Sequence, residues 1–245
     1  MSNRRSVCAV IGAGDGLGAA IARAFAAEGL SVCVTRRPRH VETLEKLAAS
    51  IRERGGEAHA FGLDARKEGD VSAFVDTVEQ TIGPLEVLVF NIGANVRFPI
   101  VETTTQVYSK VWEMAALAGF LASREAARVM VPRGRGAILF TGATASLRGG
   151  AGYSAFAGAK HALRALAQSL AREIGPKGVH VAHVVIDGAI DGAFIRGLMP
   201  DAAEKLEREE ILIPDEIAKN YVWLYRQKRS AWTFEMDLRP WSETW

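Results

Sequence analysis

The stretch Val7-Cys-Ala-Val-Ile-Gly-Ala-Gly-Asp-Gly-Leu-Gly18 decides the fold. Its first five residues are apolar and predict a buried strand, and its glycines lead into an amphipathic helix predicted over Gly16–Glu28. Glycines let the backbone turn tightly and approach a phosphate closely, while the N-terminus of a helix offers free N–H groups and a favourable dipole. This unit of strand, glycine loop and helix therefore predicts a dinucleotide-binding turn.

The rest of the chain alternates short β-rich runs with longer helical patterns. Further strands are predicted at Ser31–Thr35, Ala58–Leu63, Leu85–Phe90, Ala137–Thr141, Val179–Ile186 and Ala231–Leu238. Helices are predicted at Val41–Arg54, Val71–Ile82, Thr104–Met130 in one or two pieces, Tyr153–Ile174 and from Pro214 to Gln227. The polar stretch Gly188–Ile213 is predicted to be irregular, with a helix near Ala202–Glu210. Seven strands interleaved with helices predict an α/β fold, a doubly wound parallel sheet with helices on both faces.

Length, composition and charge narrow the possibilities. The 245 residues fit one large domain over residues 1–245, and 49% hydrophobic with 24% charged residues is typical of a globular protein. A formal net charge of +2 is too small to predict binding to nucleic acid or to a membrane surface. The N-terminus enters a strand pattern without an apolar signal-peptide core, so we expect a cytoplasmic protein. The two cysteines, Cys8 and Cys33, lie in apolar runs and are expected to be buried thiols.

The spacing of the loop glycines is Gly-x-x-x-Gly-x-Gly, and it resembles that of the short-chain dehydrogenase/reductase family, whose members are oxidoreductases with a Rossmann-type fold. The resemblance covers essentially the whole chain. Asp64 matches the family's adenine-binding Asp, Phe90-Asn91-Ile92-Gly93 resembles its Asn-Asn-Ala-Gly motif, and Ile186-Asp187-Gly188 stands where the family has Asn-Pro-Gly. The resemblance implies a nicotinamide cofactor held by Gly12, Gly14, Gly16, Leu17, Gly18, Asp64, Asn91, Gly93, Lys160 and Gly188.

The residues after the second predicted strand indicate which nicotinamide cofactor fits. Folds that bind NAD place an acidic residue there, where it contacts the ribose 2′-hydroxyl. This chain has Thr35-Arg36-Arg37 instead. Guanidinium groups suit a 2′-phosphate, so Arg36 and Arg37 predict NADP(H), against the alternative that they only coat a surface turn. Asp15 is a counter-signal, because some NADP-selecting relatives carry a basic residue in that loop.

The catalytic residues of the family are largely replaced. The resemblance implies a tetrad in which Ser polarises a carbonyl, Tyr transfers the proton, Lys lowers the pKa of Tyr and holds the nicotinamide ribose, and Asn anchors a water relay. Lys160 is present, but Phe156 stands four residues before it, at the place of Tyr. Ala143 and Ala116 stand at the places of Ser and Asn. A phenyl ring cannot transfer a proton, so the usual chemistry is predicted to be lost.

Three other side chains are candidates for parts of that chemistry. A slip of one residue in the alignment gives the Ser role to Thr144, with Ser146 also near. Tyr153 lies seven residues before Lys160, about 10 Å along a helix axis, so it either bends inward from the entry loop or packs as a wall aromatic. Asp187 is the one acidic residue at the carboxyl end of a strand that is expected to face the pocket.

The site is not predicted to hold a metal, and its other wall is mixed in character. His180 and His183 are three apart in a strand pattern and point to opposite faces, which argues against a shared metal ion. Because ligands of open α/β sheets sit beyond the carboxyl ends of the strands, we expect a small-molecule substrate there, under a lid formed by residues 188–213. The substrate side is predicted to include Asn95, Arg97, Phe98, Arg148, Tyr153 and Phe194.

Two functions stay open beside non-redox chemistry in the same pocket, such as that of a lyase or isomerase, and a homodimer or homotetramer is expected. The helices Thr104–Met130 and Tyr153–Ile174 resemble those that form the family's dimer interface, and Trp232, Trp241 and Trp245 of the tail are expected to bury against a partner. The first function is an NADP(H)-dependent oxidoreductase with an unusual proton donor, because loss of general acid catalysis costs only about 10²–10⁴-fold. The second is a catalytically silent NADP(H)-binding sensor or partner protein.

Overall fold

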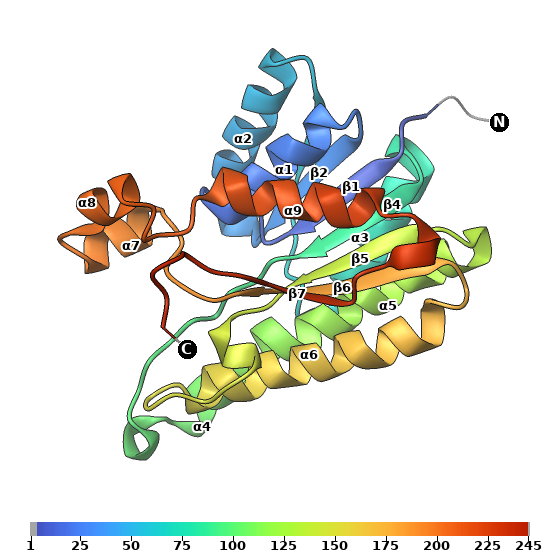
Figure 1. The fold of residues 1–245 in the computed structure, drawn as a ribbon. Coiled ribbons are helices and arrows are strands. Elements are labelled where there is room, and N and C mark those ends of the chain that lie inside the picture. Colours follow the sequence, from blue (N-terminus) through green and yellow to red (C-terminus); the bar gives the residue numbers. More distant parts are fainter. Residues whose placement is uncertain (1–3, 245) are drawn as a thin grey trace.

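The computed structural model describes residues 4–244, and its centre is a parallel sheet of seven strands in the order β3-β2-β1-β4-β5-β6-β7 (Figure 1). The prediction of a doubly wound α/β fold is confirmed. Each strand is a short apolar run that pairs with its neighbours in parallel register. The strands are β1 (Val7–Ile11), β2 (Ser31–Arg36), β3 (Glu57–Gly62), β4 (Leu85–Phe90), β5 (Gly136–Thr141), β6 (Val179–Ile186) and β7 (Glu235–Leu238).

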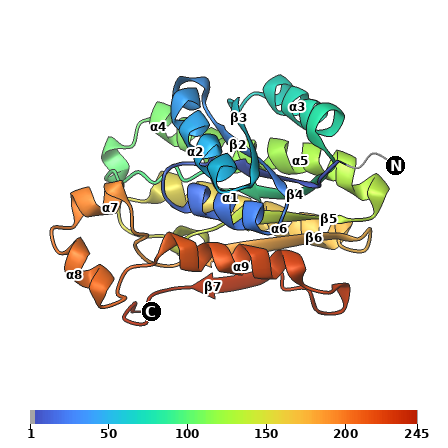
Figure 2. The same cartoon turned by 90° about the horizontal axis from the view of Figure 1, so that it is seen from above.

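Helices cover both faces of the sheet, as the two views show (Figures 1 and 2). One face packs against α1 (Leu17–Ala27), α2 (Val41–Glu53) and α9 (Pro214–Arg226). The other packs against α3 (Glu68–Thr77), α5 (Ala118–Met130) and α6 (Ser154–Ile174). Because both faces are buried, the central strands are apolar without alternation. Cys8 and Cys33 are buried free thiols, as predicted, and they face opposite sides of the sheet.

The strand order reverses beside β1, and this positions the site. β1 pairs with β2 on one side and with β4 on the other. The chain builds outward first through β2 and β3 and then through β4 to β7, so the connections leaving β1 and β4 diverge. A crevice at the carboxyl ends of strands results at such a switch point.

Several boundaries differ from the prediction for local reasons. The helix predicted at Val71 begins one turn earlier, at Glu68, because its first turn is polar and carries no apolar period; from Val78 to Ile82 it continues as a π-helical turn. The strand predicted from Ala231 begins at Glu235, where pairing with β6 starts. The helix predicted over Thr104–Met130 is α4 (Thr105–Trp112) and α5, joined by a π-helical turn at Glu113–Leu117.

The segment 188–213 is more ordered than predicted. It contains α7 (Ala193–Leu198), which the sequence did not indicate, and α8 (Ala202–Glu207), which lies at the predicted place. A bridge between Ile190 and Leu212 closes the base of the segment. Within residues 4–244, no helix combines the length and the apolar character needed to cross a bilayer.

Candidate functional site

The glycine loop between β1 and α1 is built so tightly that side chains are excluded. Gly12 has φ +97°, and a Cβ there would lie 2.9 Å from the backbone oxygen of Asn91. A Cβ at Gly18 would lie 2.5 Å from the oxygen of Gly12. The Asn91 side chain ties the loop to β4 by donating from Nδ2 to the Gly12 oxygen at 3.0 Å. The loop therefore presents backbone to the crevice, which is what a pyrophosphate requires.

The other predicted residues of the loop lie at the start of the helix. Gly16 is the N-cap of α1 and Leu17 is its first residue, so this end of the helix adjoins the glycine loop. No side chain caps this helix end. A Cβ at Gly14 would come no nearer than 4.0 Å to the Arg36 guanidinium carbon, so this glycine is not required by packing.

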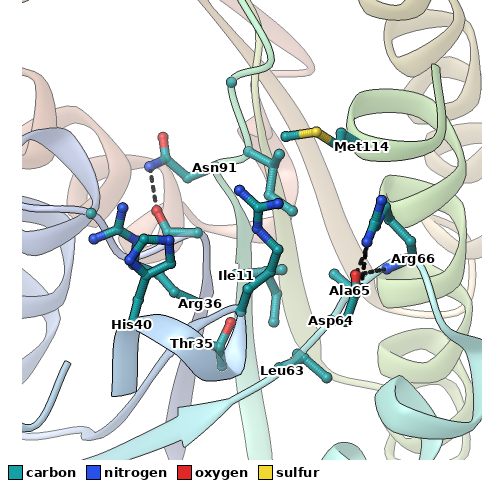
Figure 3. Close-up of a pocket in the computed structure, with 15 residues that line it drawn as sticks. Ile11, Thr35, Arg36, His40, Leu63, Asp64, Ala65, Arg66, Asn91 and Met114 are labelled. Carbon is teal, nitrogen blue, oxygen red and sulfur yellow. Dashed lines mark hydrogen bonds and ion pairs between the residues drawn. The ribbon is translucent and has the colours of Figure 1, made fainter. Parts of the chain in front are cut away.

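A cavity of about 230 Å³ lies over the ends of β1, β2 and β3, and it is strongly basic (Figure 3). Arg36 and His40 reach it from one side, and Arg66 together with Asp64 lies across from them. Arg37 also lines this cavity. Burial lowers the pKa of Arg37, and the neighbouring charges of Arg39 and Arg66 lower it further. Crowded cations of this kind are a place for an anionic group.

Two of these residues escaped the sequence analysis. Arg66 donates to both carboxylate oxygens of Asp64, at 2.9 and 2.7 Å, and this pairing holds the pKa of Asp64 below its ordinary value. His40 ends the short turn Pro38–His40 after β2. Burial and then the charge of Arg36 lower the pKa of His40. Asp15, the counter-signal, is 83% exposed and lies 3.9 Å from Arg36, too far and too solvated to neutralise the cluster.

A second cavity of about 850 Å³ lies over the ends of β4, β5 and β6. It shares Asn91, Ile92 and Gly93 with the basic cavity, so the two meet at the end of β4. Gly188 lines it with φ +148°, and a Cβ there would lie 2.8 Å from Pro240. The glycine loop also borders it through Gly16 and Leu17. The two cavities thus form one groove along the carboxyl edge of the sheet.

Lys160 lies in the wall of the larger cavity, on α6. Its ammonium is buried and donates to the backbone oxygens of Thr141 at 2.9 Å and of Ile92 at 3.1 Å. An ammonium has three N–H groups, so one donor is left for a ligand. Burial lowers the pKa of Lys160 to about 8. The Phe156 ring, 7% exposed, lies 5.9 Å from Nζ and takes the place beside the ammonium.

The candidates for the missing groups are placed differently. Tyr153 lies at the N-cap of α6, lines the larger cavity and stacks under Arg97 at 5.8 Å. Ser146 turns back into its own turn, where its hydroxyl accepts from the Ala143 N–H at 3.1 Å. Thr144 lines the cavity and donates to Asp187. Ala116 is buried in the π-helical turn between α4 and α5 and brings no polar group.

The substrate side only partly matches the expectation. Asn95, Arg148, Tyr153 and Phe194 line the larger cavity. Arg97 and Phe98 are not among its lining residues, and the Phe98 N–H donates to the Gly152 oxygen at 2.9 Å. In the part of the chain from 4 to 244, no group of three His, Cys, Asp or Glu side chains is close enough for a metal ion.

The aromatic residues of the tail have different surroundings. Trp232 stacks on His180 of its own chain, with ring centroids 4.8 Å apart. Trp241 is 76% exposed and donates to the Arg208 oxygen at 3.0 Å. Trp245 lies outside the described residues. Among the tail tryptophans that the structure describes, Trp241 is therefore the one that is exposed.

Known proteins resemble this chain in sequence and in fold. A family model described as short chain dehydrogenase matches residues 6–199. An uncharacterized oxidoreductase, YxjF, of Bacillus subtilis is 33% identical over 202 residues, which are 82% of this chain and 77% of that protein. A short-chain dehydrogenase from Rhodopseudomonas palustris is 51% identical, with a TM-score of 0.83 over 97% of this chain and all of the other. A metagenomic short-chain oxidoreductase in complex with NADP is 26% identical, with a TM-score of 0.79 over 97% of this chain and 98% of the other.

Proposed function

This chain belongs to the short-chain dehydrogenase family, and we propose that it is an NADP(H)-dependent oxidoreductase whose catalytic tetrad is reduced to Lys160. The observation that carries the proposal is the groove formed by the two cavities. A cluster of cations, a glycine cradle that admits only backbone and a buried ammonium follow one another along it. That order matches the order of groups in a phosphorylated dinucleotide.

The residues present fit such a cofactor. The cradle at Gly12 and Gly18 has room for backbone approach only, and the helix N-terminus beside it favours anions. Arg36 and Arg37 would bind the 2′-phosphate, with His40 and Arg66 near. Asp64 would contact the adenine while Arg66 fixes its carboxylate. Asn91, Gly93 and Gly188 would border the nicotinamide half, and the remaining N–H of Lys160 would bind its ribose.

The bound cofactor supplies hydride transfer, and the chain supplies position and exclusion of water. Lys160 is held rigidly by two carbonyl oxygens, so its third donor has a fixed direction. Phe156 keeps water from the ammonium on one side. Thr144 lines the larger cavity and brings a hydroxyl oxygen to it, at the place that a slip of one residue in the alignment gives to the family's Ser. Holding the reactants in place supplies a large share of catalysis without a phenol.

The second candidate, a catalytically silent NADP(H)-binding protein, is favoured by the three apolar replacements at Phe156, Ala143 and Ala116. Each removes a group that the family uses for chemistry and leaves the binding residues intact. A silent protein binds NADPH tightly and turns over no substrate. The two candidates therefore differ in turnover alone.

One experiment tests binding and turnover together. Dissociation constants for NADPH and NADH are measured on the wild type and on Arg37→Ala, and oxidation of NADPH is followed with carbonyl, enone and imine substrates. We expect NADPH to bind at least about tenfold more tightly than NADH, because a charge-assisted hydrogen bond contributes about 1.5–3 kcal/mol, and Arg37→Ala to remove most of that preference.

The outcomes separate the candidates. Equal or reversed affinities would contradict the choice of NADP(H). Tight NADPH binding without oxidation of the nicotinamide by any substrate class would favour the silent protein. Turnover in the wild type that falls in Lys160→Ala at saturating NADPH supports the oxidoreductase.

We infer two accompanying features. Residues 188–213 would act as a lid, since α7 places Phe194 and Ile195 against the larger cavity while its base is fixed by the Ile190–Leu212 bridge. The chain would form a homodimer or homotetramer through α4, α5 and α6, where Tyr108, Trp112 and Phe120 are exposed. A monomeric mass in light scattering would contradict the second inference.

A further inference from the structure

A buried carboxylate behind the wall of the larger cavity has no role in the function proposed so far. Asp187 follows β6 and is 3% exposed. Its N–H donates to the Leu238 oxygen at 2.8 Å, which fixes the backbone beside β7. The resemblance aligns Asp187 with a proline of the family, and a proline side chain has no acid–base chemistry. A buried acid costs free energy and needs partners.

The partner nearest the cavity is Thr144. Its hydroxyl donates to Oδ1 of Asp187, and Thr144 itself lines the cavity. An ionised carboxylate only accepts hydrogen bonds, so the Thr144 proton is directed away from the cavity and toward Asp187. The lone pairs of the hydroxyl oxygen are then free to accept a hydrogen bond from a ligand. The pair is arranged to take up a proton.

Two guanidinium groups balance the charge of Asp187. Nη2 of Arg239 lies 3.4 Å from Oδ2, and Nη2 of Arg148 lies 3.8 Å from Oδ1. Arg239 is also bonded to Asp237, and Arg148 lines the cavity. Cations at this distance compensate a buried charge without covering the hydroxyl of Thr144. The cluster is thus held in place from the C-terminal segment on one side and from the turn after β5 on the other.

We propose that Thr144 and Asp187 form the proton path that replaces the missing phenol. Because this path begins at an alcohol oxygen, the reaction that it serves is the interconversion of an alcohol and its carbonyl compound. The inference rests on the proposed function. In oxidation the O–H bond of the alcohol breaks and its proton passes to Thr144 Oγ1, whose own proton passes to Oδ1 of Asp187. The C–H bond breaks with both electrons, which leave as hydride for the oxidised nicotinamide cofactor, and a C=O bond forms. In reduction every transfer is reversed, starting from protonated Asp187.

Thr144 is the catalytic residue of this pair, because it touches the substrate, and Asp187 is a positioning residue that acts through it. A merely structural Asp187 would lower stability and cofactor affinity when replaced. If Asp187 instead accepts the proton, its replacement would lower kcat and leave the KM for NADP⁺ unchanged. Residues that act as a unit are also strongly non-additive, so the double variant should be no slower than the slower single variant.

The experiment uses the full chain and a panel of primary and secondary alcohols with NADP⁺, and the matching carbonyls with NADPH. Thr144→Val and Asp187→Asn should each lower kcat by about 10²-fold or more, and Thr144→Ser should stay within about tenfold of the wild type because it keeps the hydroxyl. Thr77→Val and Asp76→Asn make the same chemical changes on α3, far from the cavity. These two controls should turn over like the wild type.

A second measurement needs no cofactor. The infrared band of the Asp187 carboxylate is identified in the free protein by the difference between wild type and Asp187→Asn. It should shift in Thr144→Val and stay in place in Thr144→Ser. A band that does not move in Thr144→Val would overturn the proposal, because the hydrogen bond is its basis.

Other outcomes also overturn it, and they can be told apart. Alcohol turnover that survives both Thr144→Val and Asp187→Asn removes the proton path and leaves the oxidoreductase. Turnover of enones or imines with alcohols and carbonyls inert does the same. If the nicotinamide is neither oxidised nor reduced with any substrate, the proposed function itself is wrong, and the proton path with it.

Discussion

The two halves of the sheet's carboxyl edge differ in kind: the nucleotide half lies over β1, β2 and β3, and the reaction half lies over β4, β5 and β6. Over β1, β2 and β3 the chain presents a glycine loop, a helix N-terminus and several arginines. Over β4, β5 and β6 it presents Lys160, Thr144 and the phenyl ring of Phe156, which stands at the place that the resemblance gives to the family's Tyr. The first half carries the groups that we propose to bind NADP(H), whereas we propose that the second lacks the groups that its relatives use for proton transfer.

The difference teaches that binding and chemistry rest on different amounts of structure. Binding of a dinucleotide is spread over backbone groups and a broad electrostatic field, so no single side chain decides it. Proton transfer depends on one group at one distance from the reacting atom. A chain can therefore change its chemistry by a few substitutions while the nucleotide half stays the same.

The largest expected effect comes from restoring the family's groups in the reaction half. Phe156→Tyr combined with Ala143→Ser should raise reduction of simple ketones by about 10²–10⁴-fold. Nζ of Lys160 already lies 5.9 Å from the centroid of the Phe156 ring, so the ring and the ammonium are neighbours. Rates with NADPH measure the gain, and Phe120→Tyr on the exposed side of α5 is the matched control. An unchanged rate would show that the two halves differ by more than these side chains.

A smaller effect is expected in the nucleotide half. Gly18→Ala places a methyl group 2.5 Å from the Gly12 oxygen and 2.7 Å from the Ala13 Cα. Overpacking of this kind costs about 1–3 kcal/mol, and we expect it to appear as a loss of up to about 10²-fold in NADPH affinity, measured by titration. Gly69→Ala on α3 meets no atom within 4 Å and serves as the control. Unchanged affinity in Gly18→Ala would contradict the cradle.

The smallest expected effect is on the pH dependence of stability, and it comes from the buried Lys160 ammonium of the reaction half. Burial lowers the pKa of Lys160 to about 8, from 10.5 in the unfolded chain. Between these values the unfolded chain binds more protons, so the wild type gains stability as the pH rises from about 8 to about 10.5. The free energy of unfolding of the wild type relative to Lys160→Met should therefore increase by on the order of 1–3 kcal/mol between pH 7 and pH 10.

Urea unfolding at a series of pH values measures this change. Lys46→Met on the exposed side of α2 is the same substitution without burial and should show no such trend relative to the wild type. A constant difference for Lys160→Met would mean that the ammonium is solvated in the folded protein. In that case Lys160 would still be present in the reaction half, but burial would not lower its pKa.

The local geometry of the candidate site follows from residues that lie close together in the sequence. The positions of Gly12, Gly16 and Gly18 follow from their spacing after an apolar strand, and the structure places them in a turn that excludes side chains. Lys160 and Phe156 lie one helical turn apart, so their proximity also follows from spacing. The ends of the helices follow less directly from the local pattern. The polar first turn of α3 carries no apolar period, and α7 is too short to show one.

Only the tertiary structure decided the contacts that join distant segments. The Arg66–Asp64 pair faces Arg36 because β2 and β3 are neighbours in the sheet. The hydrogen bonds from Lys160 to the backbone oxygens of Ile92 and Thr141 form only because β4, β5 and α6 are neighbours in the fold. The Thr144–Asp187 pair joins residues 43 positions apart at the ends of β5 and β6. Hydrophobic periodicity and glycine spacing act over a few residues, so the sequence by itself determined the fold and the cradle, whereas side-chain partners across strands arise only when the sheet brings them together.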